Sequence, residues 1–345
     1  MDDLVGQVIA QGGPCDSTSV TDLRIHIASP FARAHLERIR VVSPRVRLTY
    51  HPYVPYERPV GMEAYLGDVE VLVSYHAYFE MASAPRLRWL QVGGDGVNHL
   101  RGAPIMNSDV IITNARIFAT PITEYVFASI LSYCHCFPQM MERFQKGRAW
   151  PRNQWEEYAG DEVADKTMAI IGYGSIGHTL ARVARGFEMT VIATRRSVEH
   201  PMHEDGVDVY PANHLRQVLA QADFVVVCLP LTPETEGVIG EAELRAMKPT
   251  AYLVNVGRGR VIDDTALLRA LTEGWIGGAG LDVHAQTPLP VNSPYFELAN
   301  VILTPHMSGV SQGYYERMTA LLCENLRRYM AGETLLSVVD KQKGY

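Results

Sequence analysis

Short apolar runs alternate with amphipathic stretches along most of the chain, and the alternation begins at Leu23. In the first third of the chain it predicts strands at Leu23–Ala28, Val46–Tyr50, Val69–Ser74, Leu87–Val92 and Val110–Thr113, with a short helix at Ala32–Arg40. A longer apolar stretch, Thr120–Phe137, has Pro121 near its first turn and predicts a helix. Strands that alternate with helices predict an α/β unit with a mostly parallel sheet.

The alternation resumes at Met168 and continues almost to the end of the chain. It predicts strands at Met168–Ile171, Thr190–Thr194, Phe224–Leu229, Ala251–Val256, Ala279–Val283 and Val301–Thr304. The helices expected between and after them are His178–Phe187, Leu215–Gln221, Glu241–Met247, Thr265–Glu273 and Tyr314–Met330. Strands and helices in this order are typical of a doubly wound α/β domain.

Three glycines, Gly172, Gly174 and Gly177, follow the first strand of this second series in the spacing G-x-G-x-x-G. A buried strand, a glycine-rich turn and a helix start form the turn that holds the pyrophosphate of a dinucleotide. The first glycine permits the tight turn, the second lets phosphates approach the backbone, and the third lets helix and strand pack closely. The helix N-terminus adds unpaired N–H donors. The motif therefore predicts a Rossmann domain.

This motif lies near the middle of a chain of 345 residues, a length that favours two domains. An α/β unit precedes it, and the last helix is expected to cross back to that unit. We predict a dinucleotide-binding Rossmann domain over residues 119–310, inserted into a flavodoxin-like substrate domain of residues 22–118 plus 311–345. The predicted fold class is α/β, with two doubly wound parallel-sheet domains. Residues 1–21 are polar and are expected to form an N-terminal extension without an assigned function.

The composition is that of an ordinary globular protein and disfavours several classes of partner. The chain is 47% hydrophobic and 20% charged, and its net charge of -7 does not indicate a nucleic-acid partner. The N-terminus lacks the features of a signal peptide, and no apolar run is long enough to cross a bilayer, so no membrane partner is expected. The scattered cysteines are typical of a cytoplasmic protein. Cys134 and Cys136 are expected on different faces of a helix, so we predict no metal site.

The second strand of the later series ends in two arginines, Arg195 and Arg196. In folds that bind NAD this position usually carries an acidic residue, which accepts hydrogen bonds from the ribose hydroxyls. No acidic residue stands there, and two guanidinium groups pair instead with a 2′-phosphate. The sequence therefore favours NADP(H), with NAD(H) possible. The alternative is that one or both arginines point into solvent.

Other strand ends carry Arg258, Asp282 and His306. Arg258 stands between two glycines and offers a planar fork that matches a carboxylate. His306 is a candidate proton donor near neutral pH, although a structural histidine is the more common role of a single histidine. The loop of residues 93–96 also follows a strand. It is either a ligand loop or a plain turn, because open α/β sheets place ligands at the carboxyl ends of their strands.

In combination these segments resemble the D-isomer-specific 2-hydroxyacid dehydrogenase family, over nearly everything from Leu23 to about Met330. Leu87–Leu100 is similar to the family's substrate loop, and Gly172–Gly177 to its cofactor loop. The remaining motifs that carry the resemblance are Leu229–Thr235, Lys248-Pro249 followed by Leu253–Gly259, Gly280–Val283 and Leu303–His306.

The resemblance implies an NAD(P)H-dependent enzyme that reduces a small 2-keto acid to a D-2-hydroxy acid, reversibly. Arg258 would bind the carboxylate and polarise the keto oxygen, and His306 would be the acid/base. Backbone N–H groups of the substrate-binding residues Gly94, Asp95 and Gly96 would help to hold the carboxylate. The expected cofactor-binding residues are Gly172, Gly174, Ser175, Ile176, Gly177, Arg195, Arg196, Leu229, Pro230, Val256, Gly257, Asp282, Ser308 and Gly309. Because family members are commonly dimers, a homodimer is expected.

Thr287 departs from the family pattern, because the family places there a glutamate that pairs with the catalytic histidine. A threonine cannot stabilise an imidazolium as a carboxylate does, so we expect a lower pKa for His306 and a more acidic pH optimum of reduction. One alternative is hydride transfer on an atypical substrate that needs little proton transfer, as in the formate-oxidising relatives, which also lack this glutamate. Another is a non-catalytic NAD(P)-sensing or scaffold homologue.

The expected substrate loop is also unusual, because Asp95 puts a carboxyl group where an anionic substrate is expected and Asn98 stands where the family often has aspartate. If the Asp95 side chain points into the site, it would disfavour a second anionic group on the substrate or attract a cationic one. It can equally point away. Tyr75, His76 and Trp150 are candidates for the lining of the pocket.

Overall fold

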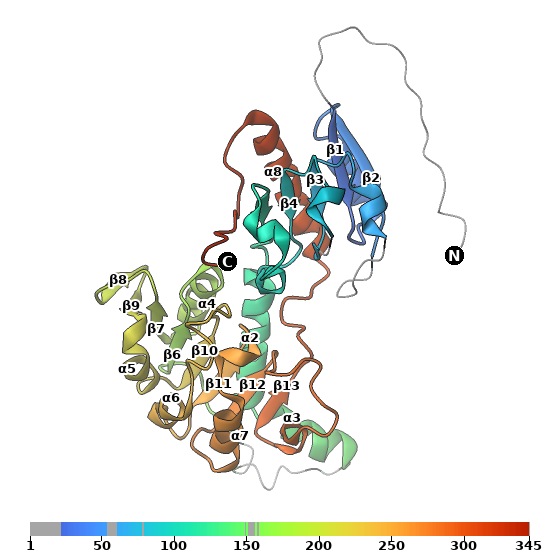
Figure 1. The fold of residues 1–345 in the computed structure, drawn as a ribbon. Coiled ribbons are helices and arrows are strands. Elements are labelled where there is room, and N and C mark those ends of the chain that lie inside the picture. The colour runs from blue at the N-terminus through green and yellow to red at the C-terminus, as the bar shows by residue number, and fades with distance from the viewer. Residues whose placement is uncertain are drawn as a thin grey trace.

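The computed structural model describes residues 22–53, 61–77, 79–148, 150, 156 and 159–344, and the predicted extension of residues 1–21 lies outside them. Within these residues the strands form two sheets, of five and eight strands (Figure 1). The first contains β1 (Leu23–Ile27), β2 (Val46–Tyr50), β3 (Val71–Val73), β4 (Trp89–Gln91) and β5 (Ile111–Thr113). The second contains β6 (Thr167–Ile171), β7 (Thr190–Arg195), β8 (Met202–Glu204), β9 (Val207–Pro211), β10 (Phe224–Val227), β11 (Tyr252–Asn255), β12 (Gly278–Leu281) and β13 (Val301–Leu303).

The order of the strands confirms the predicted fold class. The first sheet has the order β2-β1-β3-β4-β5, with parallel pairs throughout, which is the flavodoxin-like order. The second sheet has the order β13-β12-β11-β10-β6-β7-β9-β8, and β8 pairs with β9 in the antiparallel sense. The strand order reverses at β6, which leads into Gly172. Doubly wound sheets bind their ligands at such a point.

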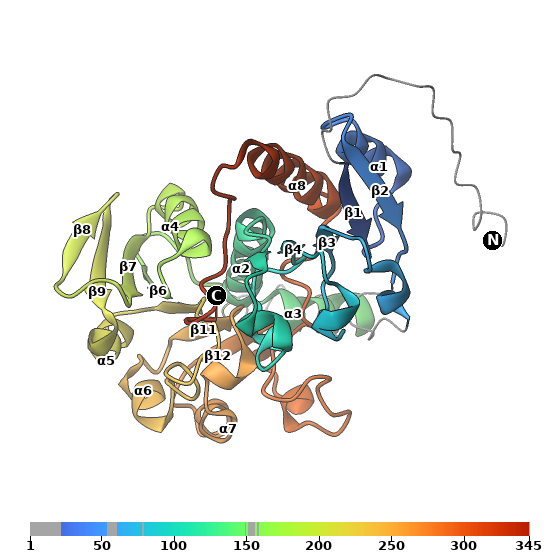
Figure 2. The ribbon, with the colours of Figure 1, turned by 45° about the horizontal axis from the view of Figure 1, so that its top comes forward.

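The helices are α1 (Arg33–Arg40), α2 (Ala119–Cys134), α3 (Phe137–Met140), α4 (Ser175–Gly186), α5 (Leu215–Leu219), α6 (Glu241–Ala246), α7 (Asp264–Thr272) and α8 (Tyr314–Ala331). The last helix, α8, lies beside α1 and β1 (Figure 2), and Leu322 and Leu326 share a core cluster with Ile25 of β1. The end of the chain therefore packs on the first sheet, whereas α2 packs on α4 of the second. None of the described helices combines the length and the apolarity that a membrane crossing needs.

The hairpin of β8 and β9 is an element that the apolar pattern does not predict. Its strands are short, and Met202 and His203 are exposed, so the alternation of apolar and polar residues is weak. The two-residue loop is Asp205-Gly206, with φ angles of 50° and 78°. Two residues with positive φ form the tight turn that suits antiparallel strands, and the pair Asp-Gly is its usual sequence signal.

Two helix boundaries also differ from the prediction. The helix α4 begins at Ser175 rather than His178, because Gly174 itself is its N-cap. The helix α2 ends at Cys134 rather than Phe137, and Cys136 has a left-handed φ of 51° that turns the chain. Cys136 therefore lies beyond the end of α2, so the prediction that both cysteines belong to this helix is wrong, and both line one cavity.

Candidate active site

The glycine-rich turn has the geometry that a pyrophosphate needs. Gly172 has a φ of 104°, a conformation that favours glycine. A Cβ on Gly174 would meet nothing within 4 Å, so the backbone there is open to a ligand. A Cβ on Gly177 would lie 3.0 Å from the carbonyl oxygen of Gly172, which shows how closely α4 packs on β6. Ser175 and Ile176 form the first turn of α4. The turn therefore fits the dinucleotide that the sequence predicts.

Two further predicted cofactor segments lie side by side, and the first of them lies against this turn. The segment after β10 contains Leu229 and Pro230, and the segment after β11 contains Val256 and Gly257. A Cβ on Gly257 would lie 2.6 Å from the carbonyl oxygen of Leu229, and a Cβ on Gly172 would lie 3.1 Å from Leu229 Cδ2. The ends of β6, β10 and β11 thus form one continuous edge.

The loop after β4 offers unengaged backbone donors beside a guanidinium group. Within the described part of the chain, the N–H groups of Gly94, Asp95 and Gly96 donate no hydrogen bond. The guanidinium of Arg258 lies against this loop, since a Cβ on Gly96 would overlap its Nη2 atom. Arg258 Nε donates to Asn98 Oδ1 at 3.2 Å, which joins the loops of the two sheets. Peptide N–H groups and a planar guanidinium together suit a carboxylate ligand.

Asp95 lies within electrostatic reach of this guanidinium. Its backbone carbonyl accepts a hydrogen bond from Asn114 Nδ2 at 2.5 Å. Desolvation raises the pKa of the Asp95 carboxyl group, and the charges of Arg116 and Arg258 oppose that rise. The carboxyl group is therefore partly withdrawn from water.

Asp282 holds the turn that carries His306. Its buried carboxylate accepts hydrogen bonds from the N–H groups of Met307 at 2.7 Å and Ser308 at 2.9 Å. It also accepts one from the hydroxyl of Thr304 at 2.6 Å, and the N–H of His306 donates to the Asp282 carbonyl oxygen at 2.8 Å. His306 has a left-handed φ of 59°. These bonds fix the unusual backbone from which the imidazole projects, while a contact of Asp282 with the nicotinamide stays a prediction.

The imidazole of His306 is influenced by Arg258 and His284. Desolvation and the charges of these two residues lower the pKa of His306, and Asp282 partly offsets them. Thr287 is exposed, and its hydroxyl makes no hydrogen bond to the His306 ring or to any other described side chain. The structure therefore leaves His306 without the hydrogen-bonded partner that a glutamate would supply.

His99 is a residue of the site that the sequence analysis misses. Its Nε2 atom hydrogen bonds with the carbonyl oxygen of Tyr75 at 2.7 Å, and the two rings stack with centroids 4.4 Å apart. A Cβ on Gly94 would lie 3.2 Å from the Tyr75 ring, so this pair borders the substrate loop. Desolvation lowers the pKa of His99, and Arg258 contributes to the shift. The signal in the sequence is its position inside the predicted substrate loop.

The structure gives Arg195 a partner that the sequence analysis also misses. Arg195 Nη2 lies 2.7 Å from Glu204 Oε2, and Arg196 is exposed. The end of β7 itself carries no acidic residue, as the sequence shows, but the β8–β9 hairpin brings Glu204 to Arg195 from a later position in the chain. The turn Asp205-Gly206 is the feature that would have revealed it.

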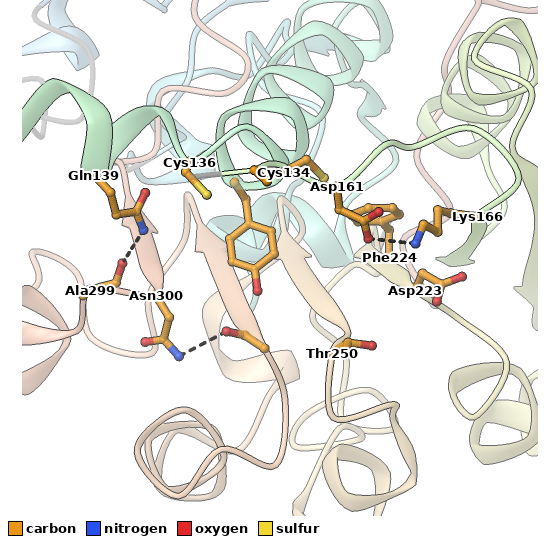
Figure 3. Close-up of a pocket in the computed structure, with 13 residues that line it drawn as sticks. Cys134, Cys136, Gln139, Asp161, Lys166, Asp223, Phe224, Thr250, Ala299 and Asn300 are labelled. Atoms are coloured by element: carbon orange, nitrogen blue, oxygen red, sulfur yellow. Dashed lines mark hydrogen bonds and ion pairs between the residues drawn. The ribbon is translucent and has the colours of Figure 1, made fainter. Parts of the chain in front are cut away.

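A cavity of about 550 Å³ lies at the opposite edge of the second sheet, near the start of β10 (Figure 3). Its lining includes Cys134, Cys136 and Asp223, and Lys166 Nζ lies 2.7 Å from Asp161 Oδ2 beside it. None of the predicted site residues lines this cavity. The candidate active site is therefore the edge formed by the carboxyl ends of the strands.

Comparison with known proteins gives the same family and fold. The model of the family described as "D-isomer specific 2-hydroxyacid dehydrogenase, NAD binding domain" matches residues 127–308. The glyoxylate reductase of Thermococcus gammatolerans is 37% identical over 304 residues, which are 84% of this chain and 89% of that protein. A D-isomer specific 2-hydroxyacid dehydrogenase family protein of Aeromonas salmonicida has a TM-score of 0.79 at 30% identity, covering 93% of this chain and 100% of that one. The NADPH-dependent glyoxylate/hydroxypyruvate reductase of Sinorhizobium meliloti, solved with NADP and sulfate, has a TM-score of 0.77 at 26% identity, covering 94% and 100%.

Proposed function

The chain belongs to the D-isomer specific 2-hydroxyacid dehydrogenase family, and from that premise we propose that Arg258 and His306 act on a small 2-keto acid to give the D-2-hydroxy acid. The protein is an NAD(P)-dependent oxidoreductase of 2-hydroxy acids, with NADP(H) favoured and NAD(H) possible. The observation that carries the residue assignment is the guanidinium of Arg258 against the unengaged N–H groups of residues 94–96. The relatives named as glyoxylate and glyoxylate/hydroxypyruvate reductases support glyoxylate or hydroxypyruvate as the substrate.

In the proposed mechanism, Arg258 and the loop of residues 94–96 hold the substrate carboxylate. Because the keto oxygen is on the adjacent carbon, the same guanidinium reaches it and stabilises the negative charge that develops there. A bound nicotinamide cofactor supplies the hydride for reduction. His306 donates the proton to the keto oxygen, and Asp282 keeps the turn of His306 in place. In the oxidative direction, neutral His306 accepts the proton of the hydroxyl group.

Asp95 supports a substrate with a single carboxylate, because a second anionic group would meet its carboxyl group beside Arg258. We expect turnover of glyoxylate and hydroxypyruvate with NADPH, and a kcat/KM at least about tenfold lower for oxaloacetate. The measurement is the absorbance of the nicotinamide band with these three acids and pyruvate, with each cofactor in turn. Tight cofactor binding without turnover of any of them would support the non-catalytic sensing or scaffold protein instead.

Thr287 leads to a prediction about pH. The protonated form of His306 donates the proton in reduction, so the rate falls as the pH rises through the pKa of His306. Desolvation and Arg258 lower that pKa, so the decline is expected at a lower pH than for an unperturbed histidine. The substitution Thr287→Glu adds a carboxylate, which raises the pKa, and should move the profile of kcat/KM upward by about one pH unit.

The uncharged variant Thr287→Gln is the control for this shift. If Thr287→Glu and Thr287→Gln give the same profile, the missing carboxylate does not set the pH dependence. A wild-type rate of reduction that does not change between pH 5 and pH 9 would favour the alternative of a substrate that needs little proton transfer.

The protein is further proposed to be a homodimer. Four large apolar side chains in and after α3 are exposed: Phe137, Met141, Phe144 and Trp150. The rings of Phe144 and Trp150 contact each other edge to face, with centroids 5.3 Å apart. Such a patch on a monomer marks an interaction surface. The variant Phe144→Asp should lower the mass measured by light scattering to that of a monomer, while Val291→Asp, at a fully exposed position, should leave it unchanged.

A cytoplasmic location and the division into domains are also proposals. The described cysteines are free thiols, which supports a reducing compartment; they are Cys134, Cys136, Cys228 and Cys323.

The packing of α8 on the first sheet supports a substrate domain of residues 22–118 plus 311–345 around the Rossmann domain of residues 119–310. Limited proteolysis tests the division, because cuts near residues 118 and 310 should release the Rossmann domain intact.

A further inference from the structure

The guanidinium of Arg195, at the end of β7, forms an ion pair with Glu204 of the β8–β9 hairpin. Arg195 Nη2 lies 2.7 Å from Glu204 Oε2 and 3.5 Å from Met202 Sδ. Met202 pairs with Val209 of β9, and Val209 pairs with Ala193 of β7. Glu204 lies further along β8, toward the hairpin turn. The backbones of both partners are therefore level with Ala193 or with earlier residues of β7.

The hairpin that carries Glu204 is held in place by α4. Arg185 of α4 donates from Nη1 to the carbonyl oxygen of Asp205 at 2.5 Å. A Cβ on Gly206 would lie 2.8 Å from Arg185 Cζ, so the turn is packed closely on this side chain. The side chains of Arg195 and Glu204 are 25% and 30% exposed, so solvent and salt screen their pair less than a pair on the open surface.

The position of Arg195 matters because of where a dinucleotide places its adenosine ribose. With the pyrophosphate at Gly172–Gly177, that ribose lies at the end of the neighbouring strand β7, where an arginine recognises the 2′-phosphate of NADP. In the observed orientation the guanidinium of Arg195 pairs with Glu204, and its Cζ atom lies 5.9 Å from the centre of the Tyr173 ring in the glycine-rich turn. Its Nε atom is buried and has no hydrogen-bond partner among the described residues, so it can still donate to a phosphate. Arg195 must leave Glu204 to reach that phosphate.

We propose that Glu204 determines cofactor selectivity by holding Arg195 away from the 2′-phosphate of NADPH, so that NADH can compete. The proposal rests on the NADP(H) preference in the proposed function, and not on the identity of the keto acid. NADPH binds most tightly to molecules in which Arg195 is released from Glu204. Its apparent affinity is therefore lower when a larger fraction of the molecules holds the ion pair. NADH has no 2′-phosphate and is not affected by the ion pair.

The test is the variant Glu204→Gln, which keeps the shape of the side chain and removes its charge. Dissociation constants of NADPH and NADH are measured by fluorescence titration of the full chain without keto acid. We expect NADPH to bind about tenfold more tightly in the variant, with the affinity for NADH unchanged. EDTA is present in all titrations, because ligand atoms of His178, Glu204 and Asp205 lie within 4.8 Å of one another and would attract stray cations.

Two further variants separate the ion pair from a general effect of charge. Asp208→Asn removes a carboxylate from the same hairpin, where it pairs with His203 at 2.8 Å, and should leave both affinities unchanged. In an Arg195→Gln background, Glu204→Gln should no longer increase the affinity for NADPH.

The proposal is overturned by any of three outcomes. Glu204→Gln leaves the ratio of the two affinities unchanged, it lowers the affinity for NADPH, or Asp208→Asn gives the same gain in affinity. Glu204→Met is the second variant if the glutamine variant does not fold. If the protein does not reduce keto acids, the activity assays of the proposed function fail, whereas these titrations of cofactor binding still test the role of Glu204.

Discussion

Replacing Arg258 by glutamine is expected to lower kcat/KM for keto-acid reduction by about 1000-fold. The substitution removes both donors of the fork that faces Gly96, so the carboxylate loses its charged partner and KM rises. It also removes the positive charge beside the keto oxygen, so kcat falls as well. The measurement is the steady-state rate with glyoxylate and saturating NADPH, with kcat and KM determined separately.

Arg258→Lys is the matched control, because it keeps the charge and loses the planar fork. We expect the kcat/KM of Arg258→Lys to lie between that of the wild type and that of Arg258→Gln. The dissociation constant of NADPH and the unfolding temperature should change little in both variants, since the one side-chain partner of Arg258 in the described part of the chain is Asn98. If Arg258→Gln lowers kcat/KM by less than about tenfold, this residue does not bind the substrate carboxylate. A rise in KM with kcat unchanged would leave it a role in binding but none in polarising the keto oxygen.

The position of the site could be predicted from the sequence because parallel strands bring their carboxyl ends to one edge. Gly172, Arg258 and His306 follow different strands of the second sheet, and the register of β6, β10, β11, β12 and β13 places those strand ends side by side. The substrate loop follows β4 of the other sheet in the same way. Topology and strand ends therefore sufficed to predict which residues lie together at this edge of the sheet.

The direction of individual side chains could not be predicted in the same way. The orientation of Arg195 depends on Glu204, which reaches it only because Asp205-Gly206 forms a hairpin turn. The left-handed backbone of His306 depends on the buried carboxylate of Asp282. Both contacts join residues that are distant in sequence, and a pattern of apolar and polar residues along one chain does not contain such contacts.

Replacing His306 by asparagine is expected to lower kcat for reduction by about 1000-fold, because the amide cannot donate a proton as an acid. Asparagine is the suitable substitution, since it tolerates the positive φ of this position better than most residues and leaves the turn around Asp282 intact. The affinity for NADPH should stay within about twofold of the wild type. The decline of the rate with rising pH, which reports the titration of His306, should disappear from the remaining activity.

His284→Asn is the matched control for this prediction. His284 lies near His306 and hydrogen bonds from its ring to the carbonyl oxygen of Thr304 at 3.1 Å, so it is held in place without an assigned proton transfer. The substitution should lower kcat by less than about tenfold, and the rate of reduction should still decline with rising pH. If His306→Asn keeps that decline, another group donates the proton. If it also keeps most of the activity, the reaction needs little proton transfer, and the exposed Thr287 in place of a glutamate is then explained by the chemistry of the substrate.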